Sequence, residues 1–252
     1  MRLKILVITL AGAALAVPAL AQDAQELSKK LNNPISDLVS VPFQFNWEFG
    51  YGANEDMHHI LNLQPVVPFR IREHTNMIAR LIVPTVSTPG ATVAGDMTFS
   101  LFFSPARSTS WIWGAGPALL LPRAGPKWAV GPTVVALKQK GNVTYGILAN
   151  QLWSIAGDNT ASDVNQTFLQ PFFAHTDKNA VTYSVNSETT VNWEAPSGDQ
   201  WAIPLNFLVS KFAKFGEFPT SYGAGIGIFV DSPSGGPEWK LRAVMTLILP
   251  NK

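Results

Sequence analysis

Residues 179–193 alternate strictly between two kinds of side chain. One set of alternate positions is mostly β-branched or aromatic, and the other is wholly polar, from Thr182 to Asn192. An extended chain directs successive side chains to opposite faces, so this segment predicts a strand with one apolar and one polar face. A soluble sandwich would place the polar face in water. A membrane barrel would place the apolar face on lipid and the polar face in a wet lumen.

The same alternation returns along most of the chain after residue 40, interrupted by turn residues. Each alternating segment is close to the roughly nine to eleven residues with which a tilted strand crosses a bilayer. An even number of strands returns both chain ends to one side of a membrane barrel. We therefore predict an all-β fold, a closed antiparallel transmembrane β-barrel of about 12 strands, with ten as the alternative because several segments are apolar on both faces. The expected strands are residues 41–50, 60–70, 77–87, 96–105, 111–121, 128–138, 143–154, 164–175, 180–193, 201–211, 220–230 and 239–249.

The composition favours the membrane barrel over the soluble sandwich. Apolar residues make up 46% of the chain and charged residues only 14%, against about a quarter in an ordinary soluble protein. A barrel whose outside contacts lipid has little need of charged residues there. The near-neutral charge and the absence of a basic patch argue against nucleic acid as a partner. Since the chain contains no cysteine, no disulfide stabilises it.

The N-terminal 21 residues have the three parts of a signal peptide. Arg2 and Lys4 are followed by an apolar run over 5–20 and by the small-x-small sequence of residues 19–21. The run is short for a membrane-spanning helix and is followed directly by polar residues. We expect cleavage near Ala21. Without Arg2 and Lys4, 16 of the 18 basic residues remain against 17 acidic ones.

Residues 22–40 form a leader with no strand pattern, ahead of a barrel expected over 41–252. Residues 24–31 can form two helical turns that the sequence Asn32-Asn33-Pro34 would stop. The leader is either a flexible periplasmic segment or a plug inside the barrel, and the sequence leaves both alternatives open.

Charges separate between the two sets of connections that a 12-stranded barrel would have. If both ends of the chain are periplasmic, the inward turns carry eight basic and three acidic residues, and the outward loops carry three basic and nine acidic residues. The outward count includes Lys240. This separation supports the strand parity.

The tryptophans form a second pattern that fits a membrane barrel. Six lie at the expected outward ends of strands and two at an inward end. Amphipathic rings gather at the two membrane interfaces, in the aromatic girdles of outer-membrane barrels. The expected girdle consists of Trp47, Trp111, Trp113, Trp128, Trp153, Trp193, Trp201 and Trp239.

Several prolines fall inside the expected strands. Proline cannot donate a hydrogen bond to a neighbouring strand, and a closed barrel has no free edge that would tolerate it. We expect several of these prolines to mark bulges or rim positions; they are Pro65, Pro84, Pro105, Pro117, Pro132, Pro171 and Pro204.

The order of motifs along the chain resembles that of a known protein family. The sequences that carry the resemblance are residues 27–38, 41–44, 63–69, 100–105, 111–117, 131–138 and 167–172. They resemble a family of Gram-negative outer-membrane proteins labelled as transporters or as phenol meta-pathway degradation proteins. The resemblance covers nearly all of the mature chain. It implies an outer-membrane, porin-like barrel that passes small molecules, and it carries over no catalytic motif.

Polar residues on the inward faces of the strands are the candidate functional residues. One interpretation is that they line a narrow aqueous path and select solutes by charge and hydrogen bonding. The other is that they pair across the lumen and fill it, since buried charges persist only when paired. The candidates are Gln44, Asn46, Glu48, Asn62, Gln64, Arg80, Asn186, Glu188, Asn192, Asn206 and Arg242.

These residues favour a barrel for passive or facilitated passage of small solutes, among them aromatic or apolar ones. The alternative is a structural or binding barrel with a filled lumen and no transport. In either case the expected partners are outer-membrane lipid, lipopolysaccharide and the barrel-assembly machinery, and for a path also a small-molecule solute.

Evidence for an enzyme is weak. A Ser-His hydrolase would need one of His58, His59, His74 and His175 beside a serine such as Ser87 or Ser154, and no spacing ties these residues together. Two adjacent histidines are too few for a metal site, which needs three or four ligands. We expect no catalytic residues, no cofactor and no metal site.

Overall fold

One helix and 15 strands make up the described part of the chain. The computed structural model describes residues 16–107, 110–123, 125, 127–215 and 218–249. The elements are α1 (Ala16–Leu31), β1 (Val39–Tyr51), β2 (Asp56–Leu63), β3 (Val66–Arg72), β4 (Thr75–Thr88), β5 (Ala91–Ala94), β6 (Met97–Pro105), β7 (Ile112–Leu121), β8 (Trp128–Lys140), β9 (Val143–Ala156), β10 (Asn165–Thr176), β11 (Val181–Ser187), β12 (Thr189–Asn192), β13 (Trp201–Phe215), β14 (Phe218–Asp231) and β15 (Trp239–Leu249).

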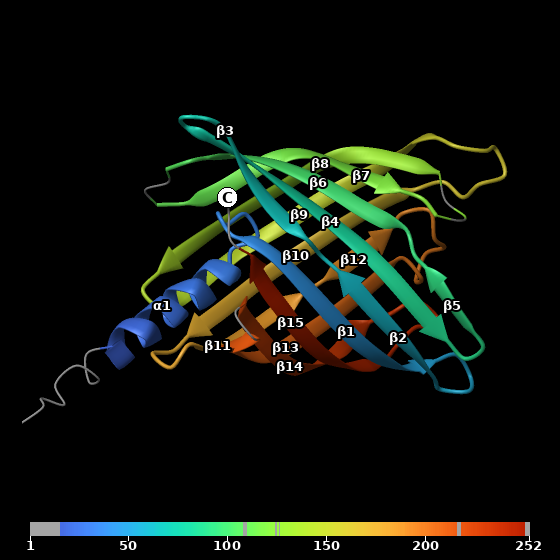
Figure 1. Ribbon diagram of the computed structural model, residues 1–252. Helices are drawn as coiled ribbons and strands as arrows, with labels where there is room; N and C mark the ends of the chain where they lie inside the picture. Colours follow the sequence, from blue (N-terminus) through green and yellow to red (C-terminus); the bar gives the residue numbers. More distant parts are fainter. Residues whose placement is uncertain (1–15, 108–109, 124, 126, 216–217, 250–252) are drawn as a thin grey trace, which may run out of the picture.

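The sheet closes into a barrel because its first strand, β1, pairs with its last, β15 (Figure 1). Three barrel strands are each interrupted once, and their two pieces run beside the same neighbour. Thus β2 and β3 both pair with β1 and β4, β5 and β6 both pair with β4, and β11 and β12 both pair with β10 and β13. Counted this way, the described strands form a closed antiparallel barrel of 12, which confirms the predicted fold.

Each predicted strand coincides with one barrel strand, and most differences are extensions at the ends. For example, β13 continues to Phe215 where the pattern predicted an end at residue 211, because it stays paired with β14 as far as Phe215 opposite Phe218. The predicted strand 60–70 is divided at Gln64 and Pro65, and the predicted strand 180–193 is divided at Glu188. The short β5, beside β4, had no counterpart in the prediction.

On β1 and β15 the polar face points into the barrel and the apolar face points out, whereas the inward faces of β7, β8 and β9 carry buried apolar side chains such as Leu120, Val135 and Leu148. On β1, Asn46 and Glu48 are 3% and 7% exposed, whereas Phe45 is 37% exposed. In a closed sheet the outward side chains have no second layer to cover them, so large aromatic and aliphatic groups remain exposed along β9, β13 and β14. The exterior therefore has the apolar character of a surface that contacts lipid.

The in-strand prolines coincide with irregularities of the sheet. Pro117 and Pro132 lie opposite each other, and each falls where pairing with the strand on its other side is interrupted. Pro65 occupies the break between β2 and β3, and Pro204 adjoins a register shift in β13. The barrel thus accommodates residues that lack an N–H donor at positions where a backbone hydrogen bond is already absent.

The helix α1 lies at one end of the barrel, on the left in Figure 1. This leader end also contains the turns that the sequence assigned to the inward side, including residues 141–142 and 177–180. Of the predicted signal peptide, residues 1–15 lie outside the described residues, and α1 runs through the expected cleavage position. The helix in the described part of the chain does not meet the length and hydrophobicity that a membrane-crossing helix requires.

Gly225 on β14 provides a test of the close approach between neighbouring strands. A Cβ at Gly225 would meet the carbonyl oxygen of Phe207 on β13. We expect Gly225→Ala to lower the free energy of unfolding by about 1–3 kcal/mol, the usual cost of overpacking. The control Ala224→Leu adds bulk on the exposed outer face and should have little effect. Urea unfolding in detergent micelles measures both, and equal stability of Gly225→Ala and wild type would contradict the described packing.

Candidate functional site

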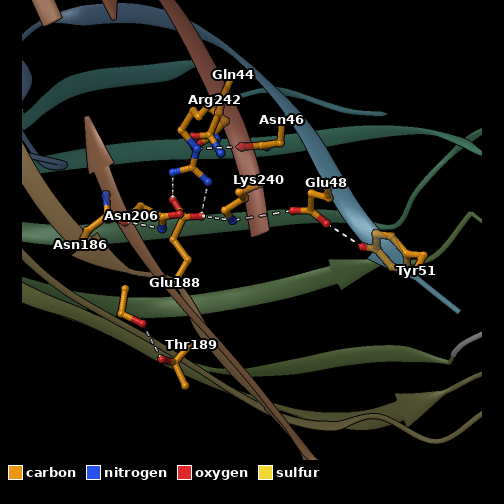
Figure 2. Close-up of polar contacts among 12 residues, drawn as sticks. Gln44, Asn46, Glu48, Tyr51, Asn186, Glu188, Thr189, Asn206, Lys240 and Arg242 are labelled. Atoms are coloured by element: carbon orange, nitrogen blue, oxygen red, sulfur yellow. Dashed lines mark hydrogen bonds and ion pairs between the residues drawn. The ribbon is translucent and has the colours of Figure 1, made fainter. Parts of the chain in front are cut away.

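A layer of paired charges crosses the lumen, beginning with four side chains from β1 and β15. The register of these strands places Asn46 opposite Arg242 and Glu48 opposite Lys240. Because each residue occupies an inward position of its strand, the four side chains meet inside the barrel. Nε of Arg242 donates a hydrogen bond to Oδ1 of Asn46 at 2.7 Å, and Nζ of Lys240 lies 3.7 Å from Oε1 of Glu48 (Figure 2).

Glu188 reaches this group from the other side, at the break between β11 and β12 (Figure 2). The guanidinium of Arg242 donates two hydrogen bonds to the Glu188 carboxylate, of 2.8 and 2.6 Å. Nζ of Lys240 lies 3.9 Å from the same carboxylate. A two-point contact between a guanidinium and a carboxylate is among the strongest side-chain hydrogen-bond arrangements. The side chains of Arg242 and Lys240 are 5% and 4% exposed, so both cations depend on these partners.

Tyr51 extends the layer toward the end of the barrel opposite α1, hereafter the far end. Its hydroxyl donates a hydrogen bond of 2.6 Å to Oε2 of Glu48, and its ring stacks on the ring of His58 with 3.7 Å between centroids. Glu48 therefore has a partner on each side, a phenol and an ammonium. The charge layer is therefore anchored at three parts of the barrel wall, namely β1, β15 and the break between β11 and β12.

A second polar group lies on the leader side of the charge layer. Arg80 on β4 donates a hydrogen bond of 2.9 Å to the side-chain oxygen of Gln64, whose amide nitrogen lies 3.4 Å from the Gln44 oxygen. Across the lumen, the amide nitrogen of Asn206 donates to the Asn186 oxygen at 2.8 Å. The two groups together line opposite walls of the lumen with amides and one guanidinium.

Two cavities follow one another along the lumen. The outer cavity, of about 540 Å³, is lined by Glu48, Glu188 and Lys240 of the charge layer and by loop residues 233–237 at the far end. The inner cavity, of about 240 Å³, is lined by Gln64, Arg80 and other residues nearer the leader. Since Arg242 lies between them and lines neither, the charge layer separates the two cavities.

The leader closes the inner cavity at its other side. Residues 31–34 and 36 line this cavity, and Ile35 is buried against apolar side chains of the barrel interior, among them Ile78 and Phe102. Asn32 donates a hydrogen bond to Thr176, and Gln25 donates one to Asn142, both on the rim of the leader end. These contacts favour the plug over the flexible leader of the two alternatives that the sequence left open.

Loop 232–238 covers part of the outer cavity. Its Ser234 donates a backbone hydrogen bond of 2.8 Å to the carboxylate of Asp199, and its Gly235 accepts one of 3.0 Å from Gly52. Hydrogen bonding from Ser234 stabilises the ionised carboxyl and lowers the pKa of Asp199 from its ordinary value. The loop is therefore tied to two neighbouring loops at neutral pH.

The predicted lumen residues fall into three groups in the structure. Asn46, Glu48, Glu188 and Arg242 meet in the charge layer, and Gln44, Gln64, Arg80, Asn186 and Asn206 line the lumen beside it. Asn62 shares the inward face of β2, opposite Gln44. Asn192 is the last residue of β12 and is exposed near the far rim, where its side chain accepts a hydrogen bond from the backbone of Glu194, so it joins neither lumen group.

Lys240 was placed in two ways from the sequence, inside the predicted strand 239–249 and among the outward loop cations of the charge count. The structure confirms the first placement and contradicts the second, because Lys240 lies on β15, is 3% exposed and faces two carboxylates of the lumen. The charge count was wrong because Lys240 is only the second residue of its strand and stands next to the loop. Its spacing of two from Arg242 is the signal that places both on one face. Tyr51, also missed, stood beyond the predicted end of its strand.

The tryptophans gather at the two ends of the barrel on its outer surface. Trp128, Trp153 and Trp193 are about half exposed near the far end, and Trp111 and Trp113 are equally exposed near the leader end. Trp47, Trp201 and Trp239 also lie toward the far end. Between the two groups the outer wall is apolar, the arrangement typical of a barrel that crosses a bilayer.

The two serine side chains considered for hydrolysis have hydrogen-bond partners other than histidine. His59 lies opposite Ser87 in the sheet, but the Ser87 hydroxyl is hydrogen-bonded to Thr92 at 2.9 Å. The Ser154 hydroxyl is engaged with the backbone of Val164. Among the described residues, no group of three or more His, Cys, Asp or Glu side chains could hold a metal ion.

Comparison with solved structures identifies the same architecture in outer-membrane channels. The COG4313 outer membrane channel from Pseudomonas putida F1 matches with a TM-score of 0.62 and 14% sequence identity, over 84% of this chain and 94% of that one. The NanC porin matches with a TM-score of 0.55 and 10% identity, over 84% of this chain and 100% of that one. No protein-family model and no curated protein matches the sequence. At these identities the likeness is one of fold.

Removal of Glu188 tests the charge layer. We expect Glu188→Gln to lower the free energy of unfolding by about 3–5 kcal/mol, because it leaves Arg242 and Lys240 without their shared counter-charge in a buried site. The control Glu194→Gln neutralises an exposed carboxylate of the neighbouring loop and should change stability by less than about 0.5 kcal/mol. Urea unfolding in detergent micelles measures both. Equal stability of the two variants would mean that the layer is solvated and contributes little.

Proposed function

We propose that this protein is an outer-membrane channel of a Gram-negative bacterium that passes small solutes, among them aromatic or apolar ones, by passive or facilitated diffusion. The observation that carries the proposal is the succession of two cavities along the lumen, separated by one layer of side chains. A single layer of rotatable side chains is a small obstacle to a solute, because the solute can replace some of the hydrogen bonds within the layer. The fold shared with the COG4313 channel and the NanC porin supports the same function.

In this proposal the chain is exported with its signal peptide, cleaved near Ala21, and inserted by the barrel-assembly machinery. Lipid and the membrane-proximal part of lipopolysaccharide would contact the apolar exterior and the tryptophan girdle. Membership of the family labelled for phenol meta-pathway degradation is part of the proposal and accounts for the resemblance in residues 27–38 and 111–117.

A second candidate is a structural or binding barrel with a closed lumen. It is favoured by one observation, the leader residues 31–36 that border the inner cavity and bury Ile35 against the barrel interior. If the leader never leaves, solutes reach the inner cavity from the far end only. The two candidates therefore differ in whether the leader is displaced.

Deletion of residues 22–36 tests both candidates. We expect the complete mature chain to give small, intermittent conductance steps in planar lipid bilayers, and the deletion variant to give larger and longer-lived ones, because the inner cavity then opens at the leader end. The control Gln139→Ala removes a single hydrogen bond between the rim and Lys29 and should keep the conductance of wild type. Background conductance of both the complete chain and the deletion variant would contradict a path and favour the closed barrel.

A further inference from the structure

Among the charged side chains that the structure describes in the lumen, the cations outnumber the carboxylates by one. The polar groups described above include three cations, Arg80, Lys240 and Arg242, and two carboxylates, Glu48 and Glu188. Both oxygens of Glu188 accept hydrogen bonds from Arg242, and Lys240 lies between the two carboxylates. Of these three cations, Arg80 alone has no carboxylate at ion-pair distance, so we assign the excess positive charge to it; Glu188 acts on it only from farther away.

The guanidinium of Arg80 faces the inner cavity with most of its donors unused. Within the described residues it makes one hydrogen bond, to the neutral side chain of Gln64. No acidic residue in the described part of the chain lines the inner cavity, whereas amides of Gln170 and Asn186 do. A guanidinium has five N–H donors and binds carboxylates at two points. An anion that entered this cavity would find one cation, amide donors and no competing negative charge on its walls.

The remaining walls of the inner cavity combine polar and apolar side chains. The polar ones are Asn32, Asn33, Ser36, Ser40, Ser184 and Thr246. Pro42 and Val66 line the cavity on the side of β1 and β3, Phe172 lines it on β10, and Leu31 borders it from the leader. Its volume is about 240 Å³. An engineered apolar cavity of about 150 Å³ is large enough to take up benzene. The inner cavity can therefore hold a ring together with one carboxylate group.

We propose that the inner cavity is a binding site for a small organic monoanion with an apolar body, of the size of a one-ring carboxylate. The carboxylate pairs with Arg80 and the apolar body packs against Phe172, Pro42 and Val66. This inference rests on the proposed passage of solutes, for which it names the class of substrate. In this site Arg80 recognises the negative charge of the ligand, and the leader closes the cavity at its end of the barrel.

Benzoate is the probe for this site, with benzyl alcohol, benzylamine and acetate as comparison ligands. Isothermal titration of the folded protein in detergent micelles should give a lower Kd for benzoate than for any of the three. Benzyl alcohol lacks the charge, benzylamine reverses it, and acetate lacks the apolar body. Equal binding of benzoate and benzylamine would overturn the proposal, since Arg80 would then play no part.

Variants of Arg80 test whether this residue binds the carboxylate of benzoate. Arg80→Gln should raise the Kd of benzoate about ten- to a hundredfold, the loss expected for hydrogen bonds to a charged group. Arg80→Lys keeps the charge and should retain the preference for benzoate over benzyl alcohol. The control Arg72→Gln removes an exposed arginine at the end of β3 and should leave the Kd unchanged. Heat-modifiable migration on gels verifies that each variant is folded.

The outcomes separate this inference from the proposed function. If benzoate binding depends on Arg80 but the protein has no conductance, the binding site is supported and the channel function is contradicted. If the protein has conductance but Arg80→Gln binds benzoate as well as wild type does, the channel function is supported and the binding site is contradicted.

Discussion

Closure of the sheet between β1 and β15 determines which face of each described strand is outside and which is inside. Once the first and last strands pair, every strand has a neighbour on both sides and the period-two pattern acquires a fixed meaning. One face of each strand turns to the exterior and the other to the lumen. The same pairing sets Asn46 opposite Arg242 and Glu48 opposite Lys240, so the contact that closes the barrel also assembles the charge layer.

The charge layer shows how a narrow barrel can contain ionised groups. Arg242 and Lys240 are nearly inaccessible, and each lies within reach of a carboxylate. Glu188 meets Arg242 at the point where β11 ends and β12 begins, so a break in the sheet accompanies the two-point contact. Arg80 differs, because its hydrogen-bond partner is neutral and no acidic residue among those described lines the cavity beside it. Pairing thus stabilises the layer, whereas Arg80 has no carboxylate at ion-pair distance and its guanidinium is available to a solute.

Much of the fold was predictable from the sequence because alternation is a local property. The inward positions of Asn46, Glu48 and Arg242 follow from the pattern of their own strands, and so do the end positions of Trp111 and Trp239. The partners of these residues did not follow, because register across β1 and β15 joins residues about 200 positions apart. Pro65 indicated an irregularity where β2 ends and β3 begins, but the break at Glu188 was not predicted, since an interrupted strand and a continuous one have the same alternation on each side.

The leader illustrates a different limit of the sequence. Its helix was predictable from residues 24–31, but the place of Ile35 inside the barrel was not. A single apolar residue after a proline has no periodic pattern, and its burial depends on Ile78 and Phe102 of distant strands. Lys240 was placed wrongly in the charge count for a related reason, because the residues at a strand end do not show which side of the rim they occupy.

Because the sequence contains no cysteine, site-directed spin labelling can test directly whether β13 and its neighbours separate lipid from a polar lumen. Single cysteines at Phe207, Leu208, Val209 and Ser210 on β13, labelled in reconstituted bilayers, would be compared for collision with oxygen and with a water-soluble nickel complex. We expect labels at 207 and 209 to collide mainly with oxygen, and labels at 208 and 210 to be shielded from it. Equal or reversed accessibility along the four positions would contradict this expectation.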